Sequence, residues 1–153
     1  MTGPLYRHIG CCIDDSPASA SALTHARELW SPAAGRLSLV HVAPRPLIFD
    51  RVDGSPVPSP RDISSLEREW LRARAGELPG SEPVFLEGMP GREICRWAEE
   101  AAVDLLVAGR NHGGWGTRAL GSVTRHLVDH APCPVLVVNP VRAPRSAEPA
   151  SAA

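Results

Sequence analysis

The sequence predicts an α/β fold in which five parallel strands form a sheet between layers of helices. Short apolar runs alternate along the chain with segments whose apolar residues recur at helical spacing. This alternation favours crossover connections, and therefore a parallel sheet whose strands are buried on both faces. The 153 residues are enough for one domain, which we expect to cover 1–139 and to be followed by a disordered tail, 140–153.

Five runs are predicted as strands because each is short, apolar and bounded by turn residues. They are 8–13, 37–42, 84–86, 104–108 and 135–138. The first run ends at Asp14-Asp15-Ser16, where a helix begins with Ser16 as its capping residue and Pro17 in its first position. The last run follows Pro132-Cys133-Pro134, in which the prolines prevent a helix from continuing.

Four helices are predicted between these strands, the first of them from Ser16 to about Trp30. Their expected apolar faces are Ala20, Leu23, Ala26 and Trp30 in the first, Ile63, Leu66, Trp70 and Ala73 in the second, Ile94, Trp97, Ala98 and Ala101 in the third, and Val123, Leu127 and Val128 in the fourth. The three tryptophans on these faces are expected to anchor the core. Five prolines between Ala43 and Pro60 predict a surface loop, and Gly80 and Pro83 are expected to end the second helical region.

Composition argues against several classes of protein. Sixteen basic residues nearly balance seventeen acidic ones, so the chain lacks the basic excess typical of a duplex-binding protein. No apolar run reaches the ~20 residues of a membrane span, and the first residues do not resemble a signal peptide. We therefore expect a cytoplasmic protein without nucleic-acid or membrane partners. Every basic residue is arginine, which excludes a lysine-dependent phosphate loop.

The four cysteines show no zinc spacing and no Cys-x-x-Cys pair. We expect Cys11, Cys12, Cys95 and Cys133 to be buried, unreactive thiols, because free cysteine behaves as a small apolar residue. A redox role for the adjacent Cys11 and Cys12 is the alternative. No metal site is predicted: His126 and His130 stand one helical turn apart, but no third ligand lies nearby in the sequence.

Polar and glycine-rich segments follow the first, second and fourth predicted strands. In open parallel sheets, ligands bind beyond the carboxyl ends of the strands, where the strand order reverses. Asp14 ends the first strand and is placed to accept a hydrogen bond from a ribose hydroxyl or a base. The segment 108–122 leads into a helix, whose free N–H groups and dipole favour an anion, with Gly121 and Ser122 at its start. Together these features predict a nucleotide site.

Each feature also has a simpler interpretation. Gly121-Ser122 is typical of a turn with a helix cap, and Asp14-Asp15-Ser16 is typical of a helix start without any ligand. Arg110, His112 and Arg118 fit solvated loop residues, and His41, inside a strand, fits a hydrogen-bonded histidine of the core.

The order of elements, with three local motifs, resembles the universal stress protein (UspA-like) family from His8 to Val138. The motifs are Leu-Gly-Ser-Val at 120–123, His-Ala-Pro-Cys-Pro-Val-Leu-Val-Val at 130–138 and Ile-Asp-Asp-Ser-Pro at 13–17. The resemblance implies a Rossmann-like (adenine nucleotide alpha hydrolase-like) domain that binds ATP or a related adenine nucleotide, with or without Mg²⁺. It also implies a stress-response module without catalytic residues, and a homodimer formed through the last strand, Val135 to Val138.

In ATP-binding members of that family the phosphate loop has the pattern Gly-x2-Gly-x9-Gly-(Ser/Thr). This chain keeps the spacing as Ala108-x2-Asn111-x9-Gly121-Ser122, with two glycines replaced. Asparagine tolerates the left-handed backbone region, and Gly109 supplies some of the freedom that Ala108 lacks. By resemblance the ligand-binding residues are Asp14, Val42, Ala108, Gly109, Asn111, Gly121 and Ser122, with Val42 contacting adenine through its backbone.

Two other functions remain open from the sequence. The replaced glycines favour a degenerate family member that no longer binds ATP and acts as a protein-interaction module. An enzyme, such as an ATPase or a nucleotidyl transferase, is a third hypothesis, in which Arg110 or Arg118 stabilises charge and His112 acts as the base. The sequence shows no acidic pair near the loop for Mg²⁺, and we therefore expect no enzyme.

Overall fold

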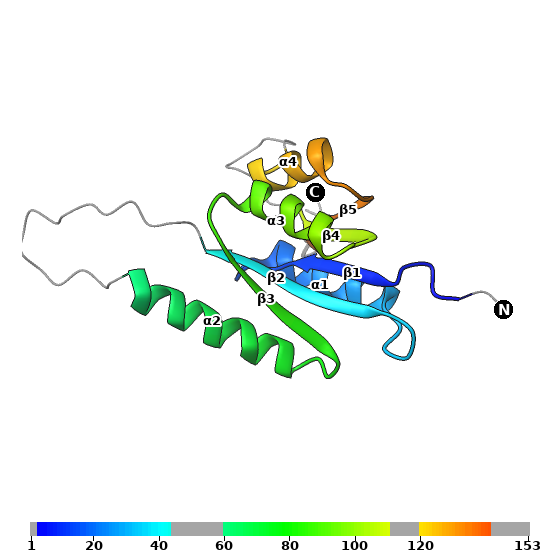
Figure 1. Ribbon diagram of the computed structural model, residues 1–153, viewed down its shortest axis with the longest axis horizontal. Helices are drawn as coiled ribbons and strands as arrows, with labels where there is room; N and C mark the ends of the chain where they lie inside the picture. The colour runs from blue at the N-terminus through cyan, green and yellow to red at the C-terminus, as the bar shows by residue number, and fades with distance from the viewer. Residues whose placement is uncertain (1–2, 44–59, 111–119, 142–153) are drawn as a thin grey trace, which may run out of the picture.

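A five-stranded parallel sheet with four helices forms the fold, as predicted (Figure 1). The computed structural model describes residues 3–43, 60–110 and 120–141. The elements in chain order are β1 (His8–Cys12), α1 (Pro17–Leu29), β2 (Arg36–Ala43), α2 (Pro60–Gly76), β3 (Ser81–Glu87), α3 (Pro90–Glu100), β4 (Leu105–Gly109), α4 (Ser122–His130) and β5 (Val135–Val138). The strands lie in the order β3-β2-β1-β4-β5, so β1 is central and the order reverses between β1 and β4.

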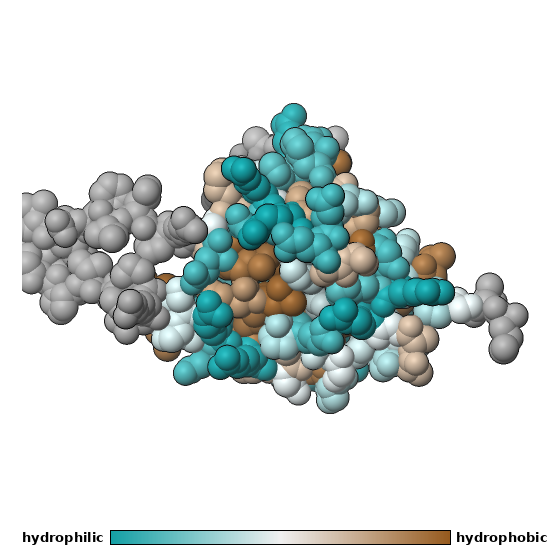
Figure 2. Space-filling model, in the orientation of Figure 1, coloured by the Kyte–Doolittle hydropathy of each residue, from teal (hydrophilic) through white to brown (hydrophobic). Residues whose placement is uncertain are grey.

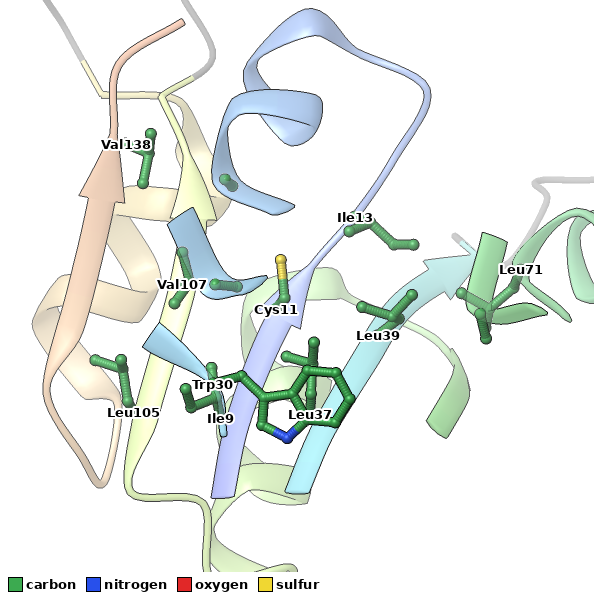
Figure 3. Packing of buried hydrophobic residues seen from close by; sticks show 13 residues of the cluster. Ile9, Cys11, Ile13, Trp30, Leu37, Leu39, Leu71, Leu105, Val107 and Val138 are labelled. Carbon is green, nitrogen blue, oxygen red and sulfur yellow. The ribbon is translucent and has the colours of Figure 1, made fainter. Parts of the chain in front are cut away.

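Two apolar cores form because successive side chains of each strand point to opposite faces of the sheet. Ile9, Cys11 and Leu39 are buried on the face covered by α1 and α2, the core shown in Figure 3. Val40 and Leu106 are buried on the opposite face, beneath α3 and α4. No residue of β3 is fully buried. Consistent with this, Figure 2 shows apolar surface over the sheet between α2 and α3, framed by hydrophilic side chains.

A carboxylate ties the start of β1 to the start of β4. Asp104 accepts hydrogen bonds from the backbone N–H groups of Arg7, at 2.8 Å, and His8, at 2.9 Å. The side chain of His8 is buried, and both of its ring nitrogens lie within hydrogen-bond distance of a partner: Ala101 O at 3.1 Å and Ser38 Oγ at 2.8 Å. These contacts fix the register between the central strand and its neighbour at the end opposite the candidate site.

The start of α1 agrees with its sequence prediction. The Ser16 side chain accepts a hydrogen bond from the Ser19 N–H at 3.2 Å, and Pro17 occupies the first helical position. Ser19 in turn accepts from the Asp14 N–H through its hydroxyl, at 2.9 Å. A serine three residues after the capping serine is thus part of the helix start, although it bonds the N–H of Asp14 and not, as Glu or Gln does in a capping box, the N–H of the capping residue.

Three predictions about the elements are wrong in detail. The buried face of α2 consists of Leu71 and Ala75, whereas Leu66, predicted as buried, is 66% exposed. Ile63 and Ala73, predicted on the same face, are exposed as well, and Glu67 lies 3.7 Å from His41 on β2, so a neighbouring face of the helix packs on the sheet. In the other helices Ala20 and Val128 are exposed, not buried.

The third error concerns β3, which is longer than 84–86 and includes Pro83. Proline lacks an N–H and is therefore confined to edge strands, and β3 is an edge strand. Gly80 lies in the turn before β3 with a φ of 91°, as its predicted role requires. Residues 44–59, predicted as a loop, and 142–153, most of the predicted tail, lie outside the described residues. Val141 at the start of that tail donates a backbone hydrogen bond to Ser21 Oγ in α1.

Candidate functional site

The carboxyl ends of β1, β2 and β4 bring four predicted site residues together, Asp14, Val42, Ala108 and Gly109. Cys12 pairs with Val40 and Cys11 with Val107 in the parallel ladders. Because side chains alternate between faces, Val42 and Ala108 share the face covered by α3 and α4, and Asp14, just beyond the end of β1, lines the same edge of the sheet. This is the place where the strand order reverses, at which parallel sheets bind ligands.

A hollow of about 150 Å³ lies among these residues. It is lined by Cys12, Ile13, Asp14, Ser16, Ser19, Val40, His41, Val42, Pro90, Ile94, Ala108, Gly109, Val123 and Thr124. Clefts that enclose a drug-sized ligand measure about 300–1,000 Å³, so the hollow accommodates only part of a nucleotide. Sequence reasoning missed Pro90 and Ile94, which start α3 and form an apolar wall. It had assigned Ile94 to the core only.

The Asp14 carboxylate sits in a fixed turn at the edge of the hollow. Its Oδ1 accepts the Ser16 N–H at 2.9 Å, and its own N–H donates to Ser19 Oγ. The residue is exposed, and an ionised carboxylate has about four acceptor sites, so it keeps capacity for further donors. Such a group suits the hydroxyls of a sugar.

The start of α4 differs by one residue from the prediction for Ser122. Gly121 is the capping residue, without a side-chain hydrogen bond, and Ser122 is the first helical residue, so Ser122 does not cap the helix. Neither residue lines the hollow, but Val123 and Thr124 in the same first turn do. The N–H groups of this turn therefore lie next to the hollow and favour an anion.

The end of β4 is closely packed from both faces. Ala108 is 3% exposed and belongs to the core beneath α3 and α4. Gly109 lies against the first turn of α1, where a Cβ would be 2.8 Å from Ser19 N. Its carbonyl oxygen accepts from Thr124 Oγ1 at 3.1 Å, which joins β4 to α4. Packing alone thus requires a glycine at 109.

Of the loop residues considered for the site, Asn111, His112 and Arg118 lie outside the described residues. Arg110 is partly buried, and its Nη1 donates to Asn139 Oδ1 at 3.4 Å. His41 is largely buried, as predicted, with one ring nitrogen 3.0 Å from the Ile13 carbonyl oxygen. The prediction that its ring is fully hydrogen-bonded is wrong, because Nε2 has no such partner among the described residues.

Cys11 is buried, as predicted, whereas Cys12, Cys95 and Cys133 are half-buried. Burial raises the pKa of the Cys12 thiol to about 12, and the neighbouring thiols of Cys95 and Cys133 add to the shift. Burial likewise raises the pKa values of Cys11, Cys95 and Cys133. Because the thiolate is the reactive form, the thiol in the hollow is a weak nucleophile and ligand at neutral pH.

No set of three or more potential metal ligands occurs within the described ranges 3–43, 60–110 and 120–141. His126 and His130 on α4 stack with ring centroids 4.3 Å apart. Among the helices in the described part of the chain, none is long and apolar enough to cross a membrane.

The family model of the universal stress protein family matches residues 5–139. The chain belongs to the universal stress protein family. The universal stress protein YxiE of Bacillus subtilis is 30% identical over 147 residues, covering 88% of this chain and 99% of that protein.

Solved structures share the fold of this universal stress protein. A universal stress protein in complex with cAMP is 21% identical, with a TM-score of 0.60 over 89% of this chain and 99% of that chain. An Arabidopsis thaliana family member with AMP bound is 19% identical, with a TM-score of 0.59 over 92% and 97%. At these identities the likeness shows the fold, and the Rossmann-like architecture agrees with the prediction.

Proposed function

We propose that this universal stress protein binds an adenine nucleotide and acts as a stress-response or signalling module, not as a dedicated catalyst. The observation that carries the proposal is the convergence of Asp14, Val42 and Ala108 around one hollow beside the start of α4. The complexes of related proteins with AMP and cAMP support the class of ligand.

Each part of the hollow suits one part of such a ligand. The apolar wall that includes Ile94 and Val42 suits the base, which the Val42 backbone would contact. Asp14 would accept hydrogen bonds from the ribose, and the first turn of α4, with Gly121 and Ser122, would bind phosphate through its N–H groups. ATP, with or without Mg²⁺, fits this scheme as well as AMP, because the phosphates would extend out of the hollow.

A protein-interaction module without a nucleotide is the second candidate function. The Ala108 methyl group favours it, because that group is packed in the core at a position where the family pattern has glycine. Gly109 does not compensate for the missing glycine at position 108, since α1 packs against Gly109.

The proposal includes a homodimer formed through β5. Pro134 and Val138 offer their carbonyl oxygens to β4, so the backbone groups of Val135 and Val137 point toward the open edge of the sheet. An exposed apolar edge strand of this kind favours pairing with a second strand.

The first experiment denatures the purified protein and identifies any released nucleotide by mass spectrometry. The stripped protein is then titrated by calorimetry with ATP, AMP and cAMP. Copurified or saturably bound adenine nucleotide supports the proposal, and no binding of any of the three favours the interaction module.

We expect ATP to remain uncleaved when it is incubated with the protein. Cleavage that His112→Ala abolishes would contradict the non-catalytic role.

A further inference from the structure

His41 joins the candidate site to α2. The residue lies on β2, its side chain is 13% exposed, and it lines both the site hollow and a second hollow of about 300 Å³ against α2. Its Nδ1 is 3.0 Å from the carbonyl oxygen of Ile13. A carbonyl oxygen only accepts hydrogen bonds, so Nδ1 carries a hydrogen and donates it. Ile13 directly precedes Asp14, and this bond therefore fixes the backbone that carries the Asp14 carboxylate.

The other ring nitrogen of His41 faces a carboxylate. Nε2 lies 3.7 Å from Oε1 of Glu67, and neither Nε2 nor Glu67 Oε2 has a hydrogen-bond partner in the described part of the chain, although both atoms are buried. In a neutral imidazole that is protonated at Nδ1, Nε2 is an acceptor, as is an ionised carboxylate. A buried acceptor without a partner that faces a carboxylate oxygen, here Oε1, is unfavourable, and one added hydrogen turns the contact into a charge-assisted hydrogen bond. A separation of 3.7 Å leaves no room for a bridging water.

Aromatic rings and carboxylates surround His41. The ring is walled by Trp70, edge-on with centroids 5.1 Å apart, and by Phe85 at 6.0 Å. Besides Glu67, the carboxylates of Asp14 and Asp15 line the two hollows that His41 borders. The nearby cation of α2, Arg68, lies over the Phe85 ring and 3.6 Å from the carboxylate of Glu87 on β3.

His8 provides an internal comparison. Both of its ring nitrogens have partners, a carbonyl oxygen and the Ser38 hydroxyl. A hydroxyl donates as well as accepts, so a neutral imidazole satisfies this arrangement without a further proton. The unsatisfied contact is therefore a property of the His41 position, not of buried histidine in this fold.

We propose that His41 and Glu67 together hold one proton more than a neutral imidazole and a carboxylate, and that this contact positions Ile13 and Asp14 for nucleotide binding. His41 is thus a positioning residue, and the affinity of the site depends on pH. The inference rests on the proposed function and adds a regulation of that site. The proton comes from water. When it leaves as the pH rises, Nε2 and the carboxylate repel each other, and His41 loses its fixed hold on Ile13.

The proton is tested first without any ligand, by ¹⁵N NMR of the His41 ring in the full-length protein. At about pH 6.5, near the usual titration range of histidine, we expect hydrogens on both ring nitrogens, or a shared hydrogen between Nε2 and Glu67. In Glu67→Gln the amide N–H donates to Nε2 instead, so the ring is expected to be the neutral Nδ1–H form at the same pH. A neutral, unshared Nε2 in the unaltered protein overturns the proposal.

The effect on the site is tested by cAMP affinity between about pH 6 and about pH 8. The phosphodiester of cAMP is the better probe because the phosphate monoester of AMP itself titrates near pH ~6. We expect the affinity to fall about fivefold over this range, within the limit of about tenfold per pH unit for one proton. Glu67→Gln is expected to bind with little change across the range.

Two substitutions of His41 separate positioning from bulk packing. His41→Asn places an amide nitrogen near the position of Nδ1, keeps the bond to Ile13 and does not reach Glu67, whereas His41→Ala loses both contacts. We expect His41→Asn to restore much of the affinity that His41→Ala loses, without the pH dependence.

A pH dependence that persists in Glu67→Gln, or full affinity in His41→Ala, overturns the positioning role. If cAMP and AMP bind at no pH although the NMR shows the added proton, the proposed function fails and the ligand half of this inference fails with it. The proton-bearing contact would then still stand.

Discussion

Gly109 at the end of β4 lies so close to Ala18 in α1 that a Cβ on Gly109 would overlap the Ala18 carbonyl group. The atoms in the way are backbone atoms, which cannot rotate aside as a side chain does. The approach therefore sets the distance between the first turn of α1, which follows Asp14, and the strand that carries Ala108.

Gly109→Ala is expected to lower the free energy of unfolding by about 3 kcal/mol, the upper part of the range for overpacked sites. The measurement is chemical denaturation followed by circular dichroism. Gly76→Ala is the matched control, because a Cβ at this last residue of α2 meets nothing within 4 Å. It should change stability by less than about 1 kcal/mol. Equal stability of the two variants would contradict the close packing.

Asp14→Asn is expected to weaken adenine-nucleotide binding about tenfold, since a hydrogen bond to a charged acceptor contributes about 1.5–3 kcal/mol. The amide retains an oxygen for the Ser16 N–H, so the turn should survive. Calorimetric titration gives the affinity, and thermal unfolding checks the fold. Asp129→Asn, the same change near the far end of α4, should leave affinity within about twofold. Unaltered binding by Asp14→Asn would remove Asp14 from the site.

The thiols should react with maleimide slowly in the folded protein and fully in denaturant. Burial raises the pKa of Cys12 to about 12 and raises that of Cys11 well above the usual range of a thiol, which keeps both as neutral thiols. Mass spectrometry of timed samples at pH ~8, below the usual thiol range, should show Cys11 and Cys12 labelled last. Rapid labelling of either in the folded protein would contradict this.

The same pKa shift predicts a loss of stability in alkali. The fold holds the Cys12 proton more tightly than the unfolded chain does, so this contribution is complete below pH 9.0, the reference pKa, and is lost as the pH rises toward about 12. Cys12→Ala should unfold with a shallower pH dependence across that window, as measured by denaturant titrations. An unchanged slope would argue against the shift.

Val137→Pro should convert the proposed dimer into a folded monomer. The Val137 N–H points to the open edge of β5, so its removal leaves the hydrogen bonds to β4 in place. Sedimentation equilibrium measures the mass, and circular dichroism confirms the fold. A parent protein that is already monomeric, or a variant that remains dimeric, would exclude pairing through β5.

Local chemistry explains which parts of the fold could be predicted. Ser16 and Pro17 define the start of α1 through their own side chains, and the prediction for that start is confirmed. The third strand was predicted too short because proline fits a strand only at the edge of a sheet. The sequence does not show that the strand containing Pro83, β3, lies at the edge. The face of α2 was wrong because a carboxylate, Glu67, turns inward toward a histidine on another element.

The candidate site likewise contains residues that the sequence predicts and a contact that it does not predict. Asp14 was predicted for the site because the ends of parallel strands meet at one edge of a sheet, whereas Val42 and Ala108 were assigned by resemblance to the family. The contact between His41 and Glu67 joins β2 to α2 across a long connection, and no local periodicity encodes it. Only the folded arrangement brings those two residues together.

The bonds from Asp104 to Arg7 and His8 have a consequence for how the chain assembles during synthesis. They close a loop of 97 residues, and the ladder between β1 and β4 closes others of similar length. At a synthesis rate of about 5–20 residues per second, β4 leaves the ribosome several seconds after the central strand β1, with which it pairs. Until then β1 has one unpaired edge, a point at which a nascent chain is open to chaperones and to aggregation.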